Sequence, residues 1–208
     1  QLHASFIPNC VSYDPTFAYE LAVIMQDGMR RMYEKQENVF YYITLMNENY
    51  AHPAMPTGAE ADILKGMYLL REGASGGKAD SMPRVQLLGC GAILREVIAA
   101  ADLLRKDFGV AVDVWSATSF NELRRDGLSA QRWNMLHPGQ TPRLSHVEQR
   151  LKPRKGPVVA ATDYMRAFAD QIRAFVPQRY VVLGTDGFGR SDTREKLRSF
   201  FEVDRRYV

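Results

Sequence analysis

Residues 85–116 read VQLLGCGAILREVIAAADLLRKDFGVAVDVWS and alternate between strand-like and helix-like patterns. The apolar run 85–88 ends at Gly89-Cys90-Gly91, which is typical of a strand followed by a tight turn. Residues 93–108 are predicted to form a helix that ends at Gly109, and residues 110–116 a second strand. Strand, helix and strand in this order predict a βαβ unit with parallel strands.

The same alternation continues through the rest of the chain. Strands are expected at residues 158–161 and 180–183, and helices at residues 120–125, 145–151, 163–175 and 192–201. Repeated strand–helix pairs predict an α/β fold, with a mostly parallel sheet and helices on both of its faces.

The first third of the chain predicts a smaller unit of the same wound type. Residues 8–13 are expected to be a strand, residues 39–45 a buried strand, and residues 60–65 and 67–71 a helical turn and a short strand. Between the first two strands a helix is expected to begin after Asp14, a candidate N-cap, and to run to about Glu34. We expect its apolar face to lie in the core rather than at a cofactor; this face comprises Phe17, Leu21, Ile24, Met25, Met29 and Met32.

A change of composition at residues 73–83, GASGGKADSMP, predicts a linker between two units. The predicted organisation is therefore residues 1–72, a linker at 73–83, and residues 84–208. The opening Gln1-Leu2-His3 without Met, and a close at Val208 with no terminator, lead us to expect a fragment.

Composition restricts the possible partners. The 27 Lys and Arg residues exceed the 24 Asp and Glu residues by only three, so no nucleic-acid partner is expected, and the basic stretch 143–155 is interpreted as solvated surface. Cys10 and Cys90 form no CxxC pair, which favours a reduced, cytoplasmic chain over a disulfide scaffold or a zinc site. No apolar run approaches the roughly 18 residues that cross a bilayer, so no membrane partner is expected.

No motif in the sequence forms a complete catalytic site. Gly89-Cys90-Gly91 lacks the third glycine of a dinucleotide fingerprint and is interpreted as a turn. Residues 184–189, GTDGFG, are interpreted as a structural loop, although a glycine-rich turn can present N–H groups to an anion. No two of the four histidines have metal-ligand spacing, and Asp14, Glu20 and Glu48 cannot be paired as acid and base from the sequence.

Five blocks of the chain closely resemble the bacterial homodimeric first component of pyruvate dehydrogenase, within the wider transketolase-like family. They read IPNCVSYDPTFAYELAVIMQDG (7–28), ITLMNENY (43–50), RWNMLHP (132–138), ATDYMRAFADQIRAFVP (161–177) and LGTDGFGRSD (183–192). The resemblance implies an intact enzyme that decarboxylates pyruvate on thiamine diphosphate and magnesium. That enzyme is a homodimer, and it passes the acetyl unit to a lipoyl group on an acetyltransferase core.

The same resemblance implies that this chain lacks the main catalytic residues. In the family, the GDG…NN magnesium motif and the glutamate that activates the cofactor lie before the last strand, helix and strand of the middle domain. A histidine-bearing loop is expected to end just before Gln1. We therefore expect no catalytic, cofactor-binding or metal-binding residue here, and no activity of the fragment alone.

One block suggests contact with the substrate path. Transketolases carry Ser-Arg-Gln-Asn where this chain reads Met46-Asn47-Glu48-Asn49, and their arginine grips a sugar phosphate. Asn47 in its place fits a substrate without phosphate, so Asn47, Glu48 and the nearby His52 are candidate substrate-approach residues. His52 is displaced by one position from the family pattern NENYHMP, and Asn47 is equally consistent with a loop cap. The alternatives are a non-catalytic dimerisation or docking module, and another transketolase-fold 2-oxo acid enzyme.

Overall fold

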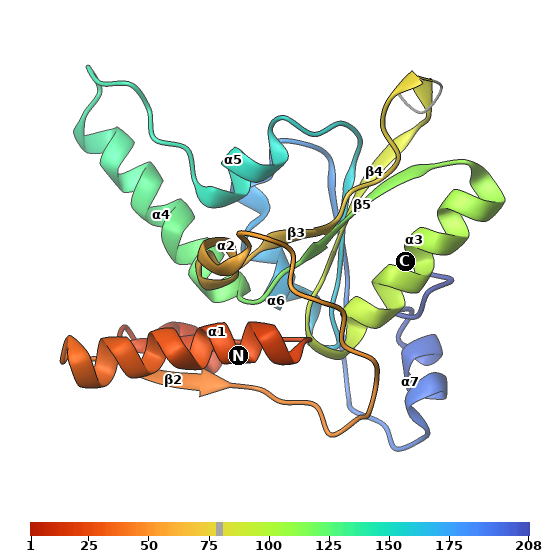
Figure 1. The fold of residues 1–208 in the computed structure, drawn as a ribbon, viewed down its shortest axis with the longest axis horizontal. Coiled ribbons are helices and arrows are strands. Elements are labelled where there is room, and N and C mark those ends of the chain that lie inside the picture. The colour runs from red at the N-terminus through yellow and green to blue at the C-terminus, as the bar shows by residue number, and fades with distance from the viewer. Residues whose placement is uncertain (78–80) are drawn as a thin grey trace.

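The computed structural model describes residues 1–77 and 81–208 (Figure 1). Residues 78–80, in the predicted linker, lie outside the described residues. The chain forms a first unit with a two-stranded sheet and a second unit with a five-stranded sheet. The expected α/β class with mostly parallel strands is confirmed.

The first unit is a strand–helix–strand unit, as predicted. Strands β1 (Cys10–Tyr13) and β2 (Phe40–Ile43) pair in parallel, joined by α1 (Ala18–Met29) and a π-helical turn at Arg30–Glu34. The prediction that the second strand is buried was wrong, because Phe40 and Tyr42 each keep 44% of their surface exposed. Within the described residues β2 pairs with β1 alone, so its other edge is unpaired.

The buried side of α1 differs from the predicted apolar face. Glu20, Ile24 and Gly28 are its buried residues, spaced by four. Gly28 lets the ring of Tyr41 approach closely, since a Cβ atom there would lie 3.3 Å from that ring. Met25 and Met29 are 51% and 58% exposed, so the expectation that they lie in the core was wrong. Each is one position beyond a buried residue, which on a helix turns its side chain by about 100° away from the core.

The helix α2 (Glu60–Lys65) lies between the two sheets in sequence and packs on the first unit, where Ile63 shares a core cluster with Ile24. The second unit then begins with β3 and continues as a regular α/β domain. Its elements are β3 (Tyr68–Arg71), β4 (Arg84–Gly89), α3 (Leu94–Phe108), β5 (Ala111–Ser116), α4 (Phe120–Leu136), α5 (His146–Leu151), β6 (Val158–Ala161), α6 (Arg166–Asp170), β7 (Tyr180–Leu183) and α7 (Arg194–Phe200). The strand order is β3-β5-β4-β6-β7, and only β3 is antiparallel to its neighbour.

Two local predictions need correction. The strand Tyr68–Arg71 was assigned to the first unit, but it pairs with β5 and therefore belongs to the second sheet. The helix predicted at 120–125 extends to Leu136, and its outer half projects from the body (Figure 1). The composition of residues 73–83 predicted a flexible connection, and the strand before it was therefore assigned to the first unit. Which strands pair is decided by tertiary contacts, which composition does not indicate. The linker at 73–83 itself remains a prediction.

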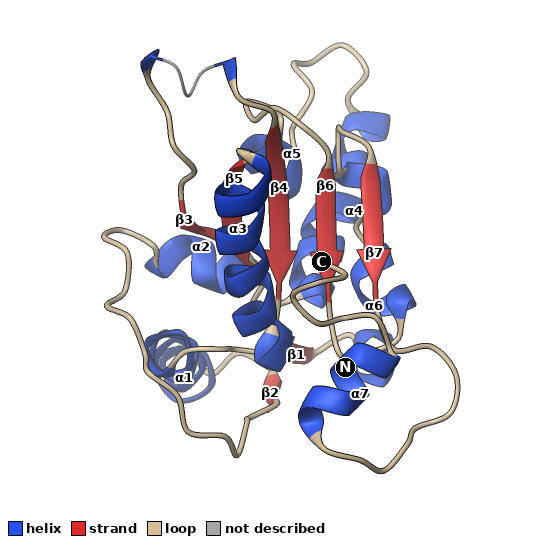
Figure 2. Cartoon of the chain, turned by 90° about the vertical axis from the view of Figure 1, so that its right-hand side faces the viewer, coloured by secondary structure: helices blue, strands red, loops and turns tan. Residues whose placement is uncertain are grey.

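Helices cover both faces of the second sheet (Figure 2). Successive strand residues point to opposite faces, so Leu88 and Trp115 pack with α4, α5 and α6, whereas Leu87 and Val114 pack with α3. The strands are therefore buried on both sides, as expected for parallel strands in an α/β fold. None of the helices in the described residues is long and apolar enough to span a bilayer.

Candidate functional site

The carboxyl ends of strands from both units meet at one junction. The backbone N–H of Asp14, just after β1, donates to Thr118 O after β5 at 2.8 Å. The hydroxyl of Thr16 donates to Gly91 O after β4 at 2.8 Å, and Ser119 donates to Ser12 O at 2.6 Å. In α/β proteins this edge of a sheet is where ligands bind. Here the two units fill it with each other's polar groups.

Glu20 is a fully buried carboxylate at the centre of this junction. One oxygen accepts hydrogen bonds from the backbone N–H groups of Thr16 at 2.5 Å and Phe17 at 2.9 Å. The other accepts from the hydroxyls of Tyr68 and Ser116, both at 2.6 Å. Burial raises the pKa of Glu20 although these four donors oppose the rise. Glu20 therefore satisfies the first turn of α1 and ties it to β3 and β5 of the second unit.

Asp14 is the second buried carboxylate at the junction. Its Oδ1 accepts a hydrogen bond from the Thr44 hydroxyl at 2.5 Å, while Oδ2 has no partner among the described residues. Burial raises the pKa of Asp14 to about 7. A Cβ atom at Gly91 would lie 2.5 Å from Asp14 Oδ2, and Gly91 has a φ of +48°. Glycine is thus required at position 91 for packing against Asp14. This packing accounts for the second glycine of Gly89-Cys90-Gly91 without any role in binding a nucleotide.

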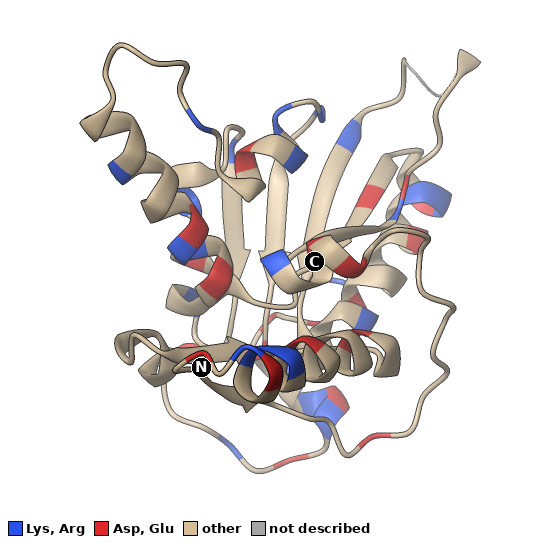
Figure 3. Cartoon of the chain, turned by 60° about the vertical axis from the view of Figure 1, so that its left-hand side comes forward, with Lys and Arg blue, Asp and Glu red and all other residues tan. Residues whose placement is uncertain are grey.

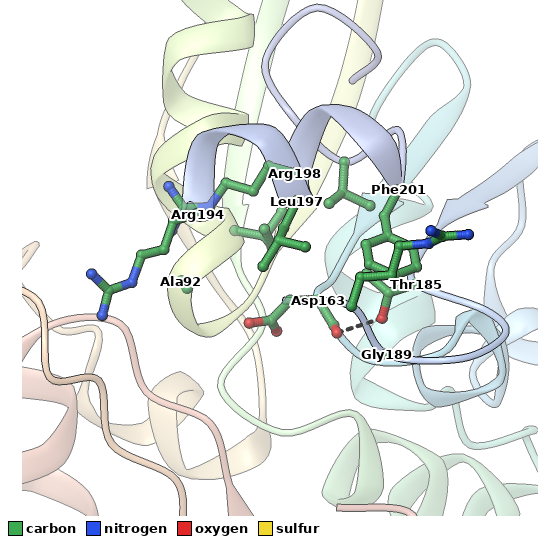
Figure 4. A pocket seen from close by; sticks show the side chains of 11 residues that line it. Ala92, Asp163, Thr185, Gly189, Arg194, Leu197, Arg198 and Phe201 are labelled. Atoms are coloured by element: carbon green, nitrogen blue, oxygen red, sulfur yellow. Dashed lines mark hydrogen bonds between the residues drawn. The ribbon is translucent and has the colours of Figure 1, made fainter. Parts of the chain in front are cut away.

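The loop after β2 brings Asn47 and Glu48 to the helices of the second unit. Arg194 of α7 donates to Asn47 Oδ1 at 2.8 Å, and Figure 4 shows Arg194 projecting from α7 away from Asp163. Glu48 forms ion pairs with Arg95 at 2.7 Å and Arg198 at 3.3 Å. The hydrogen bond from Arg95, with the charges of both arginines, lowers the pKa of Glu48. The two candidate residues therefore share one charged network.

His52 contacts the start of α1. Its Nδ1 accepts a hydrogen bond from the backbone N–H of Ala18 at 3.0 Å, and its ring stacks on Tyr50 with 4.6 Å between centroids. Ala18 is the first residue of α1, so His52 satisfies an N–H that has no partner within that helix. The structure gives His52 a capping contact and connects it to the network of Asn47 and Glu48 indirectly, through Tyr50, whose ring lies 4.5 Å from the guanidinium of Arg95.

The partners in this network were not found from the sequence. Arg194 and Arg198 are four residues apart, so a helix at this position already implied that they share one face. Nothing in the sequence indicated that this face meets residues 47 and 48, about 150 positions earlier. Figure 3 shows Lys and Arg positions interspersed with Asp and Glu positions along the helices in view.

In the described residues, no three His, Cys, Asp or Glu side chains are placed to hold a metal ion. Asp186 in the glycine-rich loop accepts from the Arg166 backbone N at 2.9 Å and Nε at 2.6 Å, and Thr185 donates to Asp163 O at 2.6 Å. The side chains of Thr185 and Asp186 are thus already used within the fold.

Asp113 is also structural. It lies within β5, fully buried, and accepts from Gly73 N at 2.8 Å, Arg84 at 2.7 Å and Gln86 at 2.8 Å. It therefore anchors neighbouring backbone and strand residues.

Two family models match successive parts of the chain. Residues 66–204 match the family described as "Transketolase-like TK C-terminal domain", and residues 1–53 match "Pyruvate dehydrogenase E1 component middle domain". Two solved structures have a similar fold. The first is a transketolase from Leishmania mexicana, with a TM-score of 0.61 and 16% sequence identity; the match covers 100% of this chain and 25% of the transketolase chain. A "Split gene transketolase, inactive beta4 tetramer" has a TM-score of 0.57 and 14% identity, covering 98% and 57%.

Curated relatives described as "Pyruvate dehydrogenase E1 component" match almost the whole chain. The protein of Cupriavidus necator is 68% identical over 206 residues, and that of Pseudomonas aeruginosa 64% over 208 residues. The Escherichia coli protein is 60% identical over 206 residues. These matches cover 97–100% of this chain but only 22–23% of the relatives' length. The chain therefore belongs to the transketolase-like C-terminal domain family and carries before that domain the end of a pyruvate dehydrogenase E1 middle domain.

Proposed function

We propose that this chain is the carboxy-terminal part of an enzyme that decarboxylates pyruvate on thiamine diphosphate and reductively acetylates a lipoyl group. The observation that carries the proposal is 68% identity over 206 residues to a protein described as "Pyruvate dehydrogenase E1 component". We further propose magnesium as the metal, a homodimer as the working unit, an acetyltransferase core as the partner, and a cytoplasmic location.

The chain's own role in this proposal is to support the active site. We propose that the cofactor and metal are held by parts of the enzyme outside this segment, because the resemblance places the magnesium motif and the activating glutamate earlier in the intact chain. Glu20 fixes the start of α1 to β3 and β5, and Glu48 fixes the loop of Asn47 to α3 and α7. These contacts set the position of the loop that leaves the carboxyl end of β2, where substrates of parallel α/β proteins pass.

Asn47 supports a substrate without phosphate. Its side chain is a neutral amide whose Oδ1 is held by Arg194 at 2.8 Å. An amide offers neutral hydrogen bonds, whereas an arginine at position 47 would offer a charged two-point contact to phosphate. A sugar-phosphate reaction of the transketolase type is the second candidate, favoured only by the fold similarity.

The decisive experiment compares substrates on the intact component. We expect the purified full-length protein, with thiamine diphosphate and magnesium, to reduce an artificial electron acceptor in the presence of pyruvate and to ignore xylulose 5-phosphate. Turnover of the sugar phosphate without turnover of pyruvate would favour the second candidate and contradict the proposal.

A companion experiment uses the 208-residue chain alone. We expect it neither to bind thiamine diphosphate in a calorimetric titration nor to release carbon dioxide from pyruvate. Such a chain would act only as a dimerisation or docking module. Cofactor-dependent release of carbon dioxide by the isolated chain would contradict the assignment of the cofactor site to other parts of the enzyme.

A further inference from the structure

Strand β2 of the first unit has an unpaired edge. The backbone N–H groups of Phe40 and Thr44 both donate to the β1 segment at 3.1 Å, so the even-numbered residues of β2 direct their backbone polar groups to β1. Tyr41 and Ile43 alternate with them and direct theirs to the opposite edge. Within the described residues no strand pairs there, and Figure 1 shows β2 at the outer side of the first unit, below α1.

The opposite edge of the same sheet, along β1, is closed by α4. The carbonyl of Cys10 accepts a hydrogen bond from Arg125 of α4 at 2.8 Å. The carbonyl of Ser12 accepts one from Ser119, the N-cap of α4, at 2.6 Å. These carbonyls alternate along β1 with the ones that bind β2. The sheet can therefore be extended beside β2 but not beside β1.

Exposed apolar side chains flank the unpaired edge. Phe40 and Tyr42 are each 44% exposed, and Leu45, just after β2, is 66% exposed. Tyr41 alternates with Phe40 and Tyr42 and lies against Gly28 of α1, so Phe40 and Tyr42 lie on the face of the sheet that is turned away from α1. Parallel strands of α/β proteins are normally covered on both faces, and β2 lacks a full cover on this one.

Helix α1 adds a second exposed apolar surface. Met25 and Met29 are 51% and 58% exposed, and Tyr33, in the π-helical turn after α1, is 78% exposed. Val23 packs in the same core cluster as Ile63 of α2. Positions two apart on a helix point in nearly opposite directions, so Met25 is turned away from α2. The uncovered apolar surface of the first unit thus includes α1 as well as β2.

The length of the relatives indicates what covers this surface. The chain spans only 22–23% of their length, and its residues 1–53 match a family model of a middle domain. A two-stranded sheet is by itself marginally stable in water, so further strands are expected beside it. A second copy of the chain fits less well. Two-fold symmetry would pair β2 with β2 and would still leave Phe40 and Tyr42 uncovered.

We propose that a strand from the part of the polypeptide outside these 208 residues pairs with the free edge of β2, and that apolar residues next to it cover Phe40, Tyr42 and Met25. The inference rests on the proposal that the chain is part of a longer E1 component, and it is independent of the reaction assigned to that component. In the enlarged sheet β1 remains the outermost strand, because α4 occupies its other edge.

Hydrogen–deuterium exchange at single-residue resolution tests the pairing in the intact component. The amides of Tyr41 and Ile43 should exchange about a hundredfold or more slowly than unpaired amides, because each would be bonded to the added strand. The amide of Thr44, which donates to Tyr13 O, is the internal control and should be protected in any case. Exchange of Tyr41 and Ile43 at the rate of unpaired amides, with Thr44 protected, would overturn the proposal.

A photo-cross-linker identifies the occupant. Tyr42→p-benzoylphenylalanine in the intact component should, on irradiation, form a link within one chain to a residue outside these 208. Phe188→p-benzoylphenylalanine, at a 96% exposed position after β7, is the matched control and should not link to the same peptide. A link that joins two chains would show that a second copy covers β2, and no link at all would show an uncovered face; either result overturns the proposal.

The exchange measurement uses the unmodified protein, so it decides the pairing even if the variant at position 42 does not fold. Pyruvate turnover by the same preparation reports separately on the proposed function. Normal turnover with unprotected amides at Tyr41 and Ile43 would refute the added strand alone, whereas protected amides without turnover of pyruvate would count against the proposed reaction alone.

Discussion

Replacing Glu20 with alanine should strongly destabilise the contact between the two units. Glu20 has no exposed surface and accepts four hydrogen bonds, two from the backbone at the start of α1 and two from Tyr68 and Ser116. The substitution leaves these donors in a buried space without an acceptor.

The magnitude follows from what each donor loses. An unsatisfied buried donor costs about 1–3 kcal/mol, so four donors set an upper limit near 12 kcal/mol. Two effects reduce this limit: Tyr68 keeps its contact with the hydroxyl of Tyr19 at 2.6 Å, and the removed carboxylate was itself costly to bury. We expect a net loss of about 3–5 kcal/mol in the free energy of unfolding.

Glu20→Gln is the matched conservative change. Its amide oxygen still accepts from the backbone of Thr16 and Phe17, and the hydroxyls of Tyr68 and Ser116 can turn to accept from its amide nitrogen. The loss should therefore be only about 1–2 kcal/mol.

Urea unfolding of the 208-residue chain, followed by circular dichroism, measures these differences. Glu34→Ala, at an exposed position after α1, is the control and should change stability by less than about 0.5 kcal/mol. If the stability of Glu20→Ala falls within about 1 kcal/mol of that control, Glu20 does not hold the units together.

Three further substitutions test the junction and the loop. The pKa of Asp14 is raised in the folded state, so the stability of the wild type falls as pH rises from the ordinary value of 3.8 to about 7. Asp14→Asn has no such charge, so it should be more stable than wild type by about 1–4 kcal/mol near pH 8 and equally stable near pH 4. A gap between the two denaturation curves that stays constant with pH would contradict this. Gly91→Ala places a Cβ atom 2.5 Å from Asp14 Oδ2 at a φ of +48°, so it should lower the free energy of unfolding by about 2–4 kcal/mol. Gly139→Ala is the control: no atom lies within 4 Å of the added Cβ, so its stability in the same denaturation experiments should be nearly unchanged. Asn47→Arg adds a second guanidinium beside Arg194 in the intact component, so the inhibition constant of a sugar phosphate should fall about tenfold; equal constants would show that Asn47 is only a loop residue.

The local alternation of strands and helices was determined by the sequence alone. Apolar runs of four to seven residues and glycine stops such as Gly109 are recognised from neighbouring residues in the chain, and the corresponding elements are present. The family could also be predicted, because long blocks such as residues 161–177 preserve order and spacing that composition does not explain.

Tertiary structure decided what packs against these elements. The helical periodicity placed Met25 and Met29 on the predicted apolar face. The position of β1 and α2 determines instead that the side of α1 through Ile24 and Gly28 is buried. In the same way, β3 lies next to the predicted linker in sequence and yet pairs with β5. The side-chain partners of Glu20 and Glu48 lie 47 to 150 positions away in the chain. Such contacts depend on the three-dimensional path of the backbone, because a hydrogen bond or an ion pair requires a separation of a few ångströms in space and places no limit on separation along the sequence.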